Sequence, residues 1–147
     1  MRITEVMTAD PACCPRDMKL PEVARFMRNN DCGEIPVIDS DTSRKLVGVI
    51  TDRDIVCRAV AGDMNIPETR VSEVMTPSPV TVANNASLDE CREKMEEHRI
   101  RRVPVIDPEG RVCGIVAQAD IARLGSMQEI AELVQDVSQR DEPRARQ

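Results

Sequence analysis

The pattern of apolar positions in the first half of the chain is repeated in the second half. A short extended segment is predicted at residues 12–14 and another at residues 80–82, and each precedes apolar residues at helical spacing. These helical positions are Leu20, Val23, Ala24 and Met27 in the first half, and Leu88, Cys91 and Met95 in the second. The spacing predicts one amphipathic helix in each half of the chain.

Two short apolar runs follow each of these helices. Residues 35–38 and 46–50 are separated by a polar turn, and residues 103–106 and 112–116 by the shorter turn Pro108-Glu109-Gly110. Such pairs are typical of β-hairpins. A second helix is then expected over residues 52–61 and again over 118–124. The predicted order is strand, helix, strand, strand, helix, twice, which is a mixed α/β (α+β) fold.

The residues themselves repeat in the same order. Glu5-Val6-Met7-Thr8 returns as Glu73-Val74-Met75-Thr76, and Ile35-Pro36-Val37-Ile38-Asp39 returns as Val103-Pro104-Val105-Ile106-Asp107. Matched blocks in one order indicate a duplicated unit. We expect a first repeat over residues 1–61, a linker over 62–70, a second repeat over 71–125, and a further helix and tail over 126–147.

The last segment carries its own helical signals. Ser126 to Glu129 spells the capping-box pattern of a helix start, and a single apolar stripe follows it. The stripe consists of Ile130, Leu133, Val134 and Val137. We predict a separate terminal helix that covers or extends a dimer surface, and a disordered charged tail over residues 140–147.

Composition narrows the classes of function. Aromatic residues make up 1% of the chain and the formal net charge is −6, which argues against stacking on bases and against binding nucleic-acid phosphates. No targeting segment and no apolar run of membrane-spanning length is seen, so we expect a cytoplasmic protein with no membrane partner. The six cysteines form no C-x-x-C pair and are expected as reduced thiols, with Cys57, Cys91 and Cys113 buried in packing.

The repeated motifs together resemble the CBS (cystathionine β-synthase) repeat over residues 5–124. The strongest stretch is Gly48-Val49-Ile50-Thr51-Asp52-Arg53-Asp54-Ile55. The resemblance implies tandem CBS repeats, each β-α-β-β-α, packed about a pseudo-twofold axis as a Bateman module that commonly forms a homodimer. It also implies two clefts that bind AMP, ADP or ATP, with S-adenosylmethionine and NAD as further adenosine ligands.

The strand-to-helix junctions are the candidate ribose sites. Thr51 and Asp54 lie one helical turn apart, where a carboxylate can accept both ribose hydroxyls, although Thr-x-x-Asp is also an ordinary helix cap. In the second repeat Asp120 keeps the carboxylate, but Ala117 replaces the hydroxyl. We therefore expect the second cleft to bind more weakly or to take a different ligand.

A basic cluster before the second hairpin is the candidate phosphate site. His98, Arg99, Arg101 and Arg102 lie there, at positions similar to the phosphate-contacting ones of the AMP-activated kinase gamma subunit, and Arg53 is expected to join them. A solvated basic patch remains the alternative. Apolar walls for adenine are predicted from Cys32, Ile35 and Pro36 in one cleft, and from Val80, Ile100, Val103 and Pro104 in the other. Simple core packing is the alternative for these apolar residues.

Other functions have weaker support in the sequence. His98 is the only histidine and no nucleophile motif accompanies it, so we expect no enzyme. A metal site built from Cys13, Cys14 and His98 would need chelation by adjacent cysteines, so we expect no metal. We therefore predict a regulatory nucleotide sensor that signals in trans to an unidentified protein target. A ligand-independent dimerisation or interaction module is the main alternative.

Overall fold

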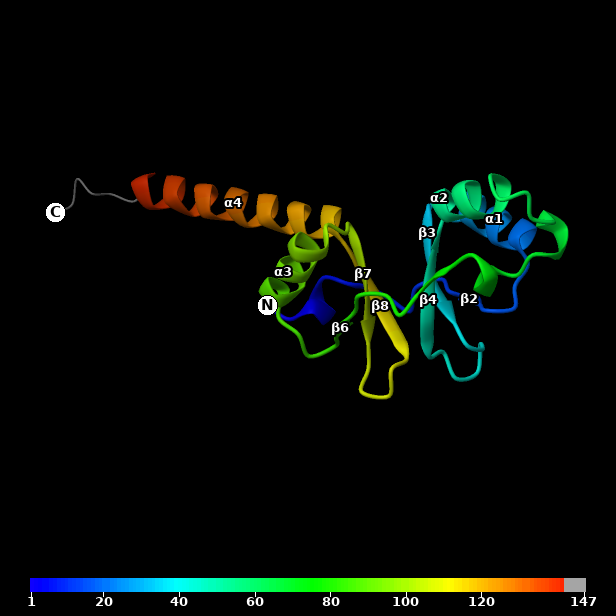
Figure 1. The fold of residues 1–147 in the computed structure, drawn as a ribbon. Coiled ribbons are helices and arrows are strands. Elements are labelled where there is room, and N and C mark those ends of the chain that lie inside the picture. The colour runs from blue at the N-terminus through cyan, green and yellow to red at the C-terminus, as the bar shows by residue number, and fades with distance from the viewer. Residues whose placement is uncertain (142–147) are drawn as a thin grey trace.

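The computed structural model describes residues 1–141, without the side chains of residues 125, 126, 129 and 136–141. Its strands form two four-stranded sheets (Figure 1). The first, in the order β2-β3-β4-β5, contains Cys14–Pro15, Glu34–Ile38, Leu46–Thr51 and Thr76–Pro77. The second, in the order β1-β8-β7-β6, contains Thr8–Ala9, Val112–Ala117, Arg102–Ile106 and Val82–Ala83. The mixed fold of two similar units and both predicted hairpins are confirmed.

Each sheet takes its last strand from the other half of the chain. β1 opens the first repeat but pairs with β8, where Thr8 lies opposite Ile115. β5 opens the second repeat but pairs with β4, where Gly48 lies opposite Pro77. The cores follow the same exchange, because the fully buried Ile3 packs in the core of the second sheet and the fully buried Val71 in that of the first. The two units therefore share their opening segments.

The two amphipathic helices form as predicted. α1 (Leu20–Asn29) buries Leu20, Val23 and Met27, and α3 (Leu88–His98) buries Leu88, Cys91 and Met95. The hydroxyl oxygen of Ser87 accepts a hydrogen bond of 3.1 Å from the main-chain N–H of Glu90 and caps the start of α3. Arg99, in the left-handed region with φ of 54°, ends that helix.

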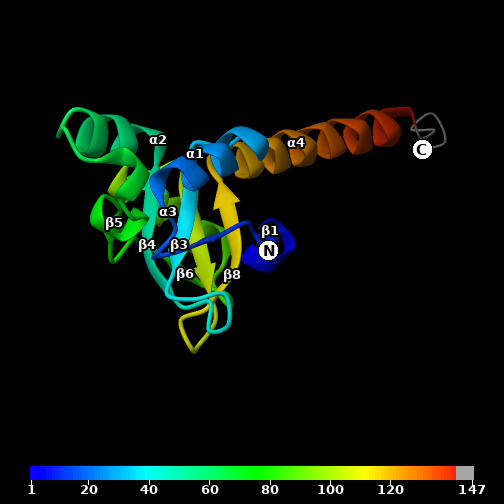
Figure 2. The same cartoon turned by 90° about the vertical axis from the view of Figure 1, so that its right-hand side faces the viewer.

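The helices that close the two halves differ. In the first half α2 (Asp52–Asp54) continues as a π-helical turn over Ile55–Val60. In the second half α4 runs from Gln118 to Asp141 without a break and extends away from the sheets (Figure 2). The separate terminal helix predicted from Ser126 was wrong, because a capping-box pattern in the interior of a helix does not interrupt it. The predicted disordered tail was wrong at residues 140 and 141, which belong to α4, and its residues 142–147 lie outside the described residues.

Short 3-10 helices occupy Ile3–Glu5, Ile66–Glu68 and Val71–Glu73. Cys57, predicted as a buried packing residue, is exposed, because the π-helical turn directs it away from the core, whereas Cys91 is buried and Cys113 half-buried. None of the helices in the described part of the chain combines the length and apolar character that a membrane crossing requires.

Candidate functional site

One cleft of about 780 Å³ lies where both hairpins start and both closing helices begin. We call it the inter-repeat cleft. It is lined by Gly33, Glu34, Asp52, Arg101, Arg102, Ala117, Gln118, Ala119 and Ala122. Three pairs among these residues occupy matching positions of the two repeats: Gly33 with Arg101, Glu34 with Arg102, and Asp52 with Gln118. Both repeats therefore contribute equivalent backbone positions to the lining of this cleft.

The matching positions carry different charges. The first repeat contributes the carboxylates of Glu34 and Asp52, and the second contributes the guanidinium groups of Arg101 and Arg102. A guanidinium nitrogen of Arg102 donates a 3.5 Å hydrogen bond to the main-chain oxygen of Glu34, across the two repeats. Burial raises the pKa of Glu34, although the positive charge of Arg102 opposes that rise and nearby Asp54 adds to it.

The Thr51 and Asp54 pair forms a reciprocal helix cap beside this cleft. The Thr51 hydroxyl oxygen accepts from the Asp54 N–H at 3.0 Å, and the Asp54 carboxylate accepts from the Thr51 N–H at 3.1 Å. The guanidinium of Arg58 lies 3.8 Å from the other Asp54 oxygen. A carboxylate offers about four acceptor positions, so Asp54 retains capacity for a further donor.

Asp120 repeats only half of that cap. Its carboxylate accepts from the Ala117 N–H at 3.1 Å and also from the Arg123 side chain, but Ala117 has no hydroxyl to return the bond. Asp120 lines a separate cavity of about 160 Å³ with Glu5, Val6, Arg123, Leu124 and Met127. The structure thus places Asp120 in a different cavity from Arg101 and Arg102.

The other predicted site residues lie at varied depths. Those on the surface are Arg53, His98 and Arg99, with His98 at 4.0 Å from the Glu97 carboxylate. Ile35, Pro36, Val103 and Pro104 are buried, whereas Cys32, Val80 and Ile100 are half-buried against the two cores. Of the predicted residues, the inter-repeat cleft brings together only Arg101 and Arg102.

Sequence reasoning missed most of the cleft lining. Glu34 and Asp52 were not predicted as site residues, and neither were Gly33, Gln118, Ala119 and Ala122. The available signal was the reversal of charge between matched positions, since Glu34 corresponds to Arg102. An acidic residue at the position that matches Arg102 would have identified the other side of the same cleft.

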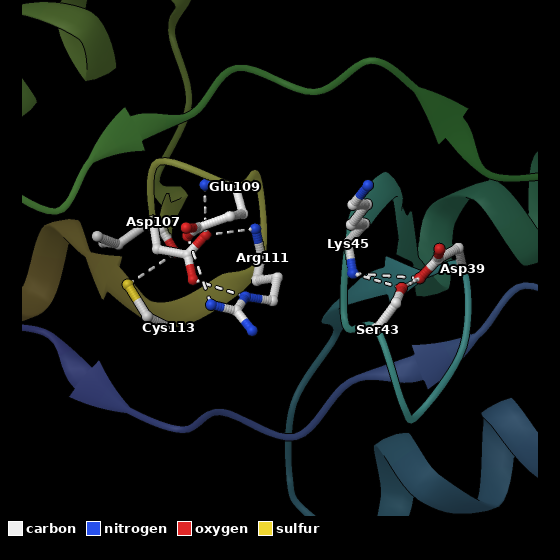
Figure 3. Close-up of polar contacts among 8 residues, drawn as sticks. Asp39, Ser43, Lys45, Asp107, Glu109, Arg111 and Cys113 are labelled. Carbon is white, nitrogen blue, oxygen red and sulfur yellow. Dashed lines mark hydrogen bonds and ion pairs between the residues drawn. The ribbon is translucent and has the colours of Figure 1, made fainter.

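The opposite end of the molecule carries the two hairpin turns side by side (Figure 3). Lys45 and Arg111 form an isolated β-bridge between them. The Ser43 hydroxyl donates to the Asp39 carboxylate and holds the pKa of Asp39 below its ordinary value. Burial opposes ionisation of Asp107, but hydrogen bonds from Arg111 outweigh it and lower the pKa of Asp107 as well. The carboxylates of Asp39 and Asp107 therefore make their hydrogen bonds within their own hairpin turns.

Two thiols in the cores, those of Cys14 and Cys91, have raised pKa values. Burial raises the pKa of Cys14 to about 12 and that of Cys91 to about 11. Within the described residues no group of three or more His, Cys, Asp or Glu side chains is placed to hold a metal ion.

Comparison with known sequences identifies both repeats. The family model of the CBS domain matches residues 3–60 and 71–126. Hypoxic response protein 1 of Mycobacterium tuberculosis is 40% identical over 119 residues, which are 81% of this chain and 81% of that protein.

Solved structures give the same result and correct one expectation. The crystal structure of Hypoxic Response Protein I with two coordinated zinc ions has a TM-score of 0.76 and 36% identity, covering 84% of this chain and 98% of that one. The zinc ions in that neighbour contradict our expectation of no metal. That expectation relied on the poor chelating geometry of adjacent cysteines within one chain segment, which says nothing about ligands from other segments.

A second solved structure contains adenosine derivatives. The CBS domain pair of protein MJ0100 in complex with 5′-methylthioadenosine and S-adenosyl-L-methionine has a TM-score of 0.74 and 28% identity, covering 87% of this chain and 98% of that one. The two sheets of this chain have the same strand order, and the family model matches both repeats. The chain belongs to the CBS domain family.

Proposed function

We propose that this protein is a regulatory module that binds an adenosine-containing ligand in the inter-repeat cleft and signals to a partner protein in trans. The observation that carries the proposal is the cleft itself, which both repeats line at matching positions and which presents two guanidinium groups. The similar pair from MJ0100, solved with two adenosine derivatives, supports the ligand class. AMP, ADP, ATP, S-adenosylmethionine and NAD all carry the required adenosine.

The roles of individual residues follow from their positions. Arg101 and Arg102 would hold a phosphate, since guanidinium groups pair with phosphate oxygens in a bidentate manner. Asp54 would accept from ribose hydroxyls with the capacity that the helix cap leaves free. Asp120 would do the same in the smaller cavity, where it lacks a neighbouring hydroxyl.

The contact between Arg102 and the Glu34 main chain gives a route for the signal. A phosphate that attracts Arg102 would compete with this hydrogen bond between the repeats. Ligand binding would then change how firmly the two units are joined, and a partner could read that change. Such coupling is typically worth about 1–3 kcal/mol.

Isothermal titration calorimetry with AMP, adenosine and UMP tests this function. We expect saturable binding of AMP, no comparable binding of UMP, and a loss of about 1.5–3 kcal/mol in AMP affinity for Arg101→Ala, with adenosine nearly unaffected. Arg92→Ala removes an exposed arginine of α3 outside both cavities and serves as the matched control. Equal binding of AMP and UMP, or no binding of any adenosine ligand, would contradict the proposal.

A second candidate function is ligand-independent dimerisation, and exposed apolar side chains favour it. Val56 and Val60 are 58% and 57% exposed, and on α4 Met127, Ile130, Leu133 and Val134 are between 59% and 64% exposed. We propose that these surfaces contact a second copy of the chain. Light scattering on the calorimetry samples separates the two functions, because a dimer that binds no adenosine ligand would leave only the second.

A further inference from the structure

The charge reversal across the inter-repeat cleft is more informative than its two arginines alone. We propose that Glu34 and Asp52 form a charge filter, which makes the cleft favour adenosine ligands of low negative charge and disfavour nucleoside di- and triphosphates. The inference rests on the proposed function and concerns the selectivity of that same cleft.

The formal charges of the lining residues sum to zero. Glu34 and Asp52 contribute two negative charges, Arg101 and Arg102 contribute two positive charges, and the other five lining residues are neutral. A single phosphomonoester carries roughly −1.5 to −2 near neutral pH, a charge of the same size as that of the two guanidinium groups together, so with both carboxylates ionised the occupied cleft is already net negative. Every additional phosphate adds negative charge for which the cleft offers no further cation.

Asp52 is held in position at the cleft. Its main-chain N–H donates to the Gly33 oxygen at 2.9 Å, and its carboxylate accepts from the Arg53 N–H at 2.8 Å. The same carboxylate lies so close over Gly33 that an added Cβ there would be only 2.8 Å from one of its oxygens. The negative charge of Asp52 is therefore fixed beside Gly33, the position that matches Arg101.

Glu34 acts from a less hydrated position. Its side chain is half-buried, and burial raises its pKa, although the guanidinium of Arg102, which contacts the Glu34 main chain, favours the ionised form. Charges interact more strongly where water is partly excluded. A polyphosphate that extends from Arg102 toward the first repeat would meet this carboxylate at short range.

The second repeat shows what the alternative would look like. If the first repeat also carried arginines at positions 33 and 34, the cleft would have four cations and would suit a polyphosphate. It has a glycine and a glutamate there instead, with an aspartate beside them. The two repeats thus have the same backbone at these positions, but the carboxylates of the first repeat make the lining unlike a general polyanion site.

Competition between AMP, ADP and ATP, measured without magnesium at fixed ionic strength, tests the charge filter. We expect wild-type protein to bind AMP more tightly than ATP. The isosteric variants Glu34→Gln and Asp52→Asn should each tighten ATP relative to AMP on the order of five- to tenfold. Asp41→Asn makes the same chemical change at an exposed aspartate in the far hairpin turn, outside the cleft lining, and should leave the ratio unchanged.

The outcomes separate this inference from the function on which it rests. If AMP binds but the ratio of ATP to AMP affinity is the same in wild type, Glu34→Gln and Asp52→Asn, the charge filter is refuted and the proposed function stands. Tighter binding of ATP than AMP by wild type would also refute the filter. If no adenosine ligand binds to any of the proteins, the proposed function itself fails. Asp52 is exposed, so Asp52→Asn provides a test that does not depend on the half-buried Glu34.

Discussion

The two repeats build the same hairpin and the same helix start, but they complete them with different side chains. In the first, Thr51 and Asp54 exchange two hydrogen bonds at the start of α2. In the second, Ala117 and Asp120 make one. The first repeat places carboxylates at the inter-repeat cleft and the second places arginines there. Positions that pack match one another, whereas positions that face the cleft differ, so the duplicated backbone supports a cleft with two unlike sides.

The largest difference between matched positions should appear at Gly48 and Gly114. A Cβ on Gly48 would lie 2.8 Å from the main-chain oxygen of Thr76 in β5, which cannot move without disturbing the exchanged strand. We expect Gly48→Ala to lower the free energy of unfolding by about 1–3 kcal/mol. The three atoms nearest to a Cβ on Gly114 all belong to the Met7 side chain, which is flexible, so Gly114→Ala should cost less. Urea denaturation of both variants measures the difference.

Double variants sharpen this comparison. Met7→Ala should relieve part of the cost of Gly114→Ala, because it removes the overlapping atoms. Met75→Ala should not relieve Gly48→Ala to the same extent, because the Thr76 oxygen remains in place. Equal costs for the two glycine substitutions, with equal relief by the two methionine substitutions, would show that the exchanged strands are held alike in both sheets.

A smaller effect should follow from the unequal helix caps. Thr51→Ala removes the hydroxyl that caps α2 and should cost about 1 kcal/mol in the free energy of unfolding. Ala117→Thr supplies the missing hydroxyl for the Asp120 N–H and should stabilise the protein by up to about 1 kcal/mol. Ala117→Val adds similar bulk without the hydroxyl and is the matched control. A gain in thermal stability from Val equal to that from Thr would exclude the cap as its cause.

The smallest effect concerns the two hairpin turns. The pKa of Asp39 is lowered by the Ser43 hydroxyl, so its stabilisation is present above the unfolded-state pKa and is lost as the pH falls through the folded-state pKa. Wild type should therefore lose more stability than Asp39→Asn between about pH 5 and pH 3. Urea midpoints measured across this range would show the difference, and parallel curves would contradict the role of Asp39.

Salt distinguishes the matching turn of the second repeat. Asp107 is ion-paired with Arg111 at 2.9 Å, whereas Asp39 accepts from a hydroxyl and from main-chain N–H groups. Added salt should therefore reduce the corresponding pH effect at Asp107 more than that at Asp39, because ion pairs at the surface are screened.

The sequence was sufficient for the elements that carry a long pattern. Both hairpins and the amphipathic helices follow from apolar spacing, and the family follows from the motif around Thr51 and Asp54. The strand exchange did not follow, because β1 and β5 are two residues long and show no alternation. The continuous α4 was missed because Ser126 to Glu129 has the composition of a helix start although it lies inside a helix.

The cleft was predicted from its cationic side only. Arg101 and Arg102, which line the cleft, were predicted as phosphate ligands because clustered arginines favour phosphate binding, and that role stays a prediction. In the sequence, Glu34 and Asp52 look like ordinary charged surface residues. Only the three-dimensional arrangement brings them into the same cleft as the arginines. Several residues expected as adenine walls are buried in the cores. The sequence could not separate the two cases, because an apolar residue that packs in the core and one that faces a ligand give the same pattern in a hairpin strand.

The exchange of β1 and β5 has a consequence for dissection of the protein. A fragment that ends in the segment between the repeats would lose β5 and leave the N–H and C=O groups of β4 without their neighbour. A fragment that begins there would lose β1 and leave β8 uncovered. Unprotected sheet edges of this kind recruit strands from other molecules and promote aggregation. A single repeat therefore lacks a strand of its own sheet. Expression of single repeats should yield misassembled or aggregated protein rather than half of a binding site.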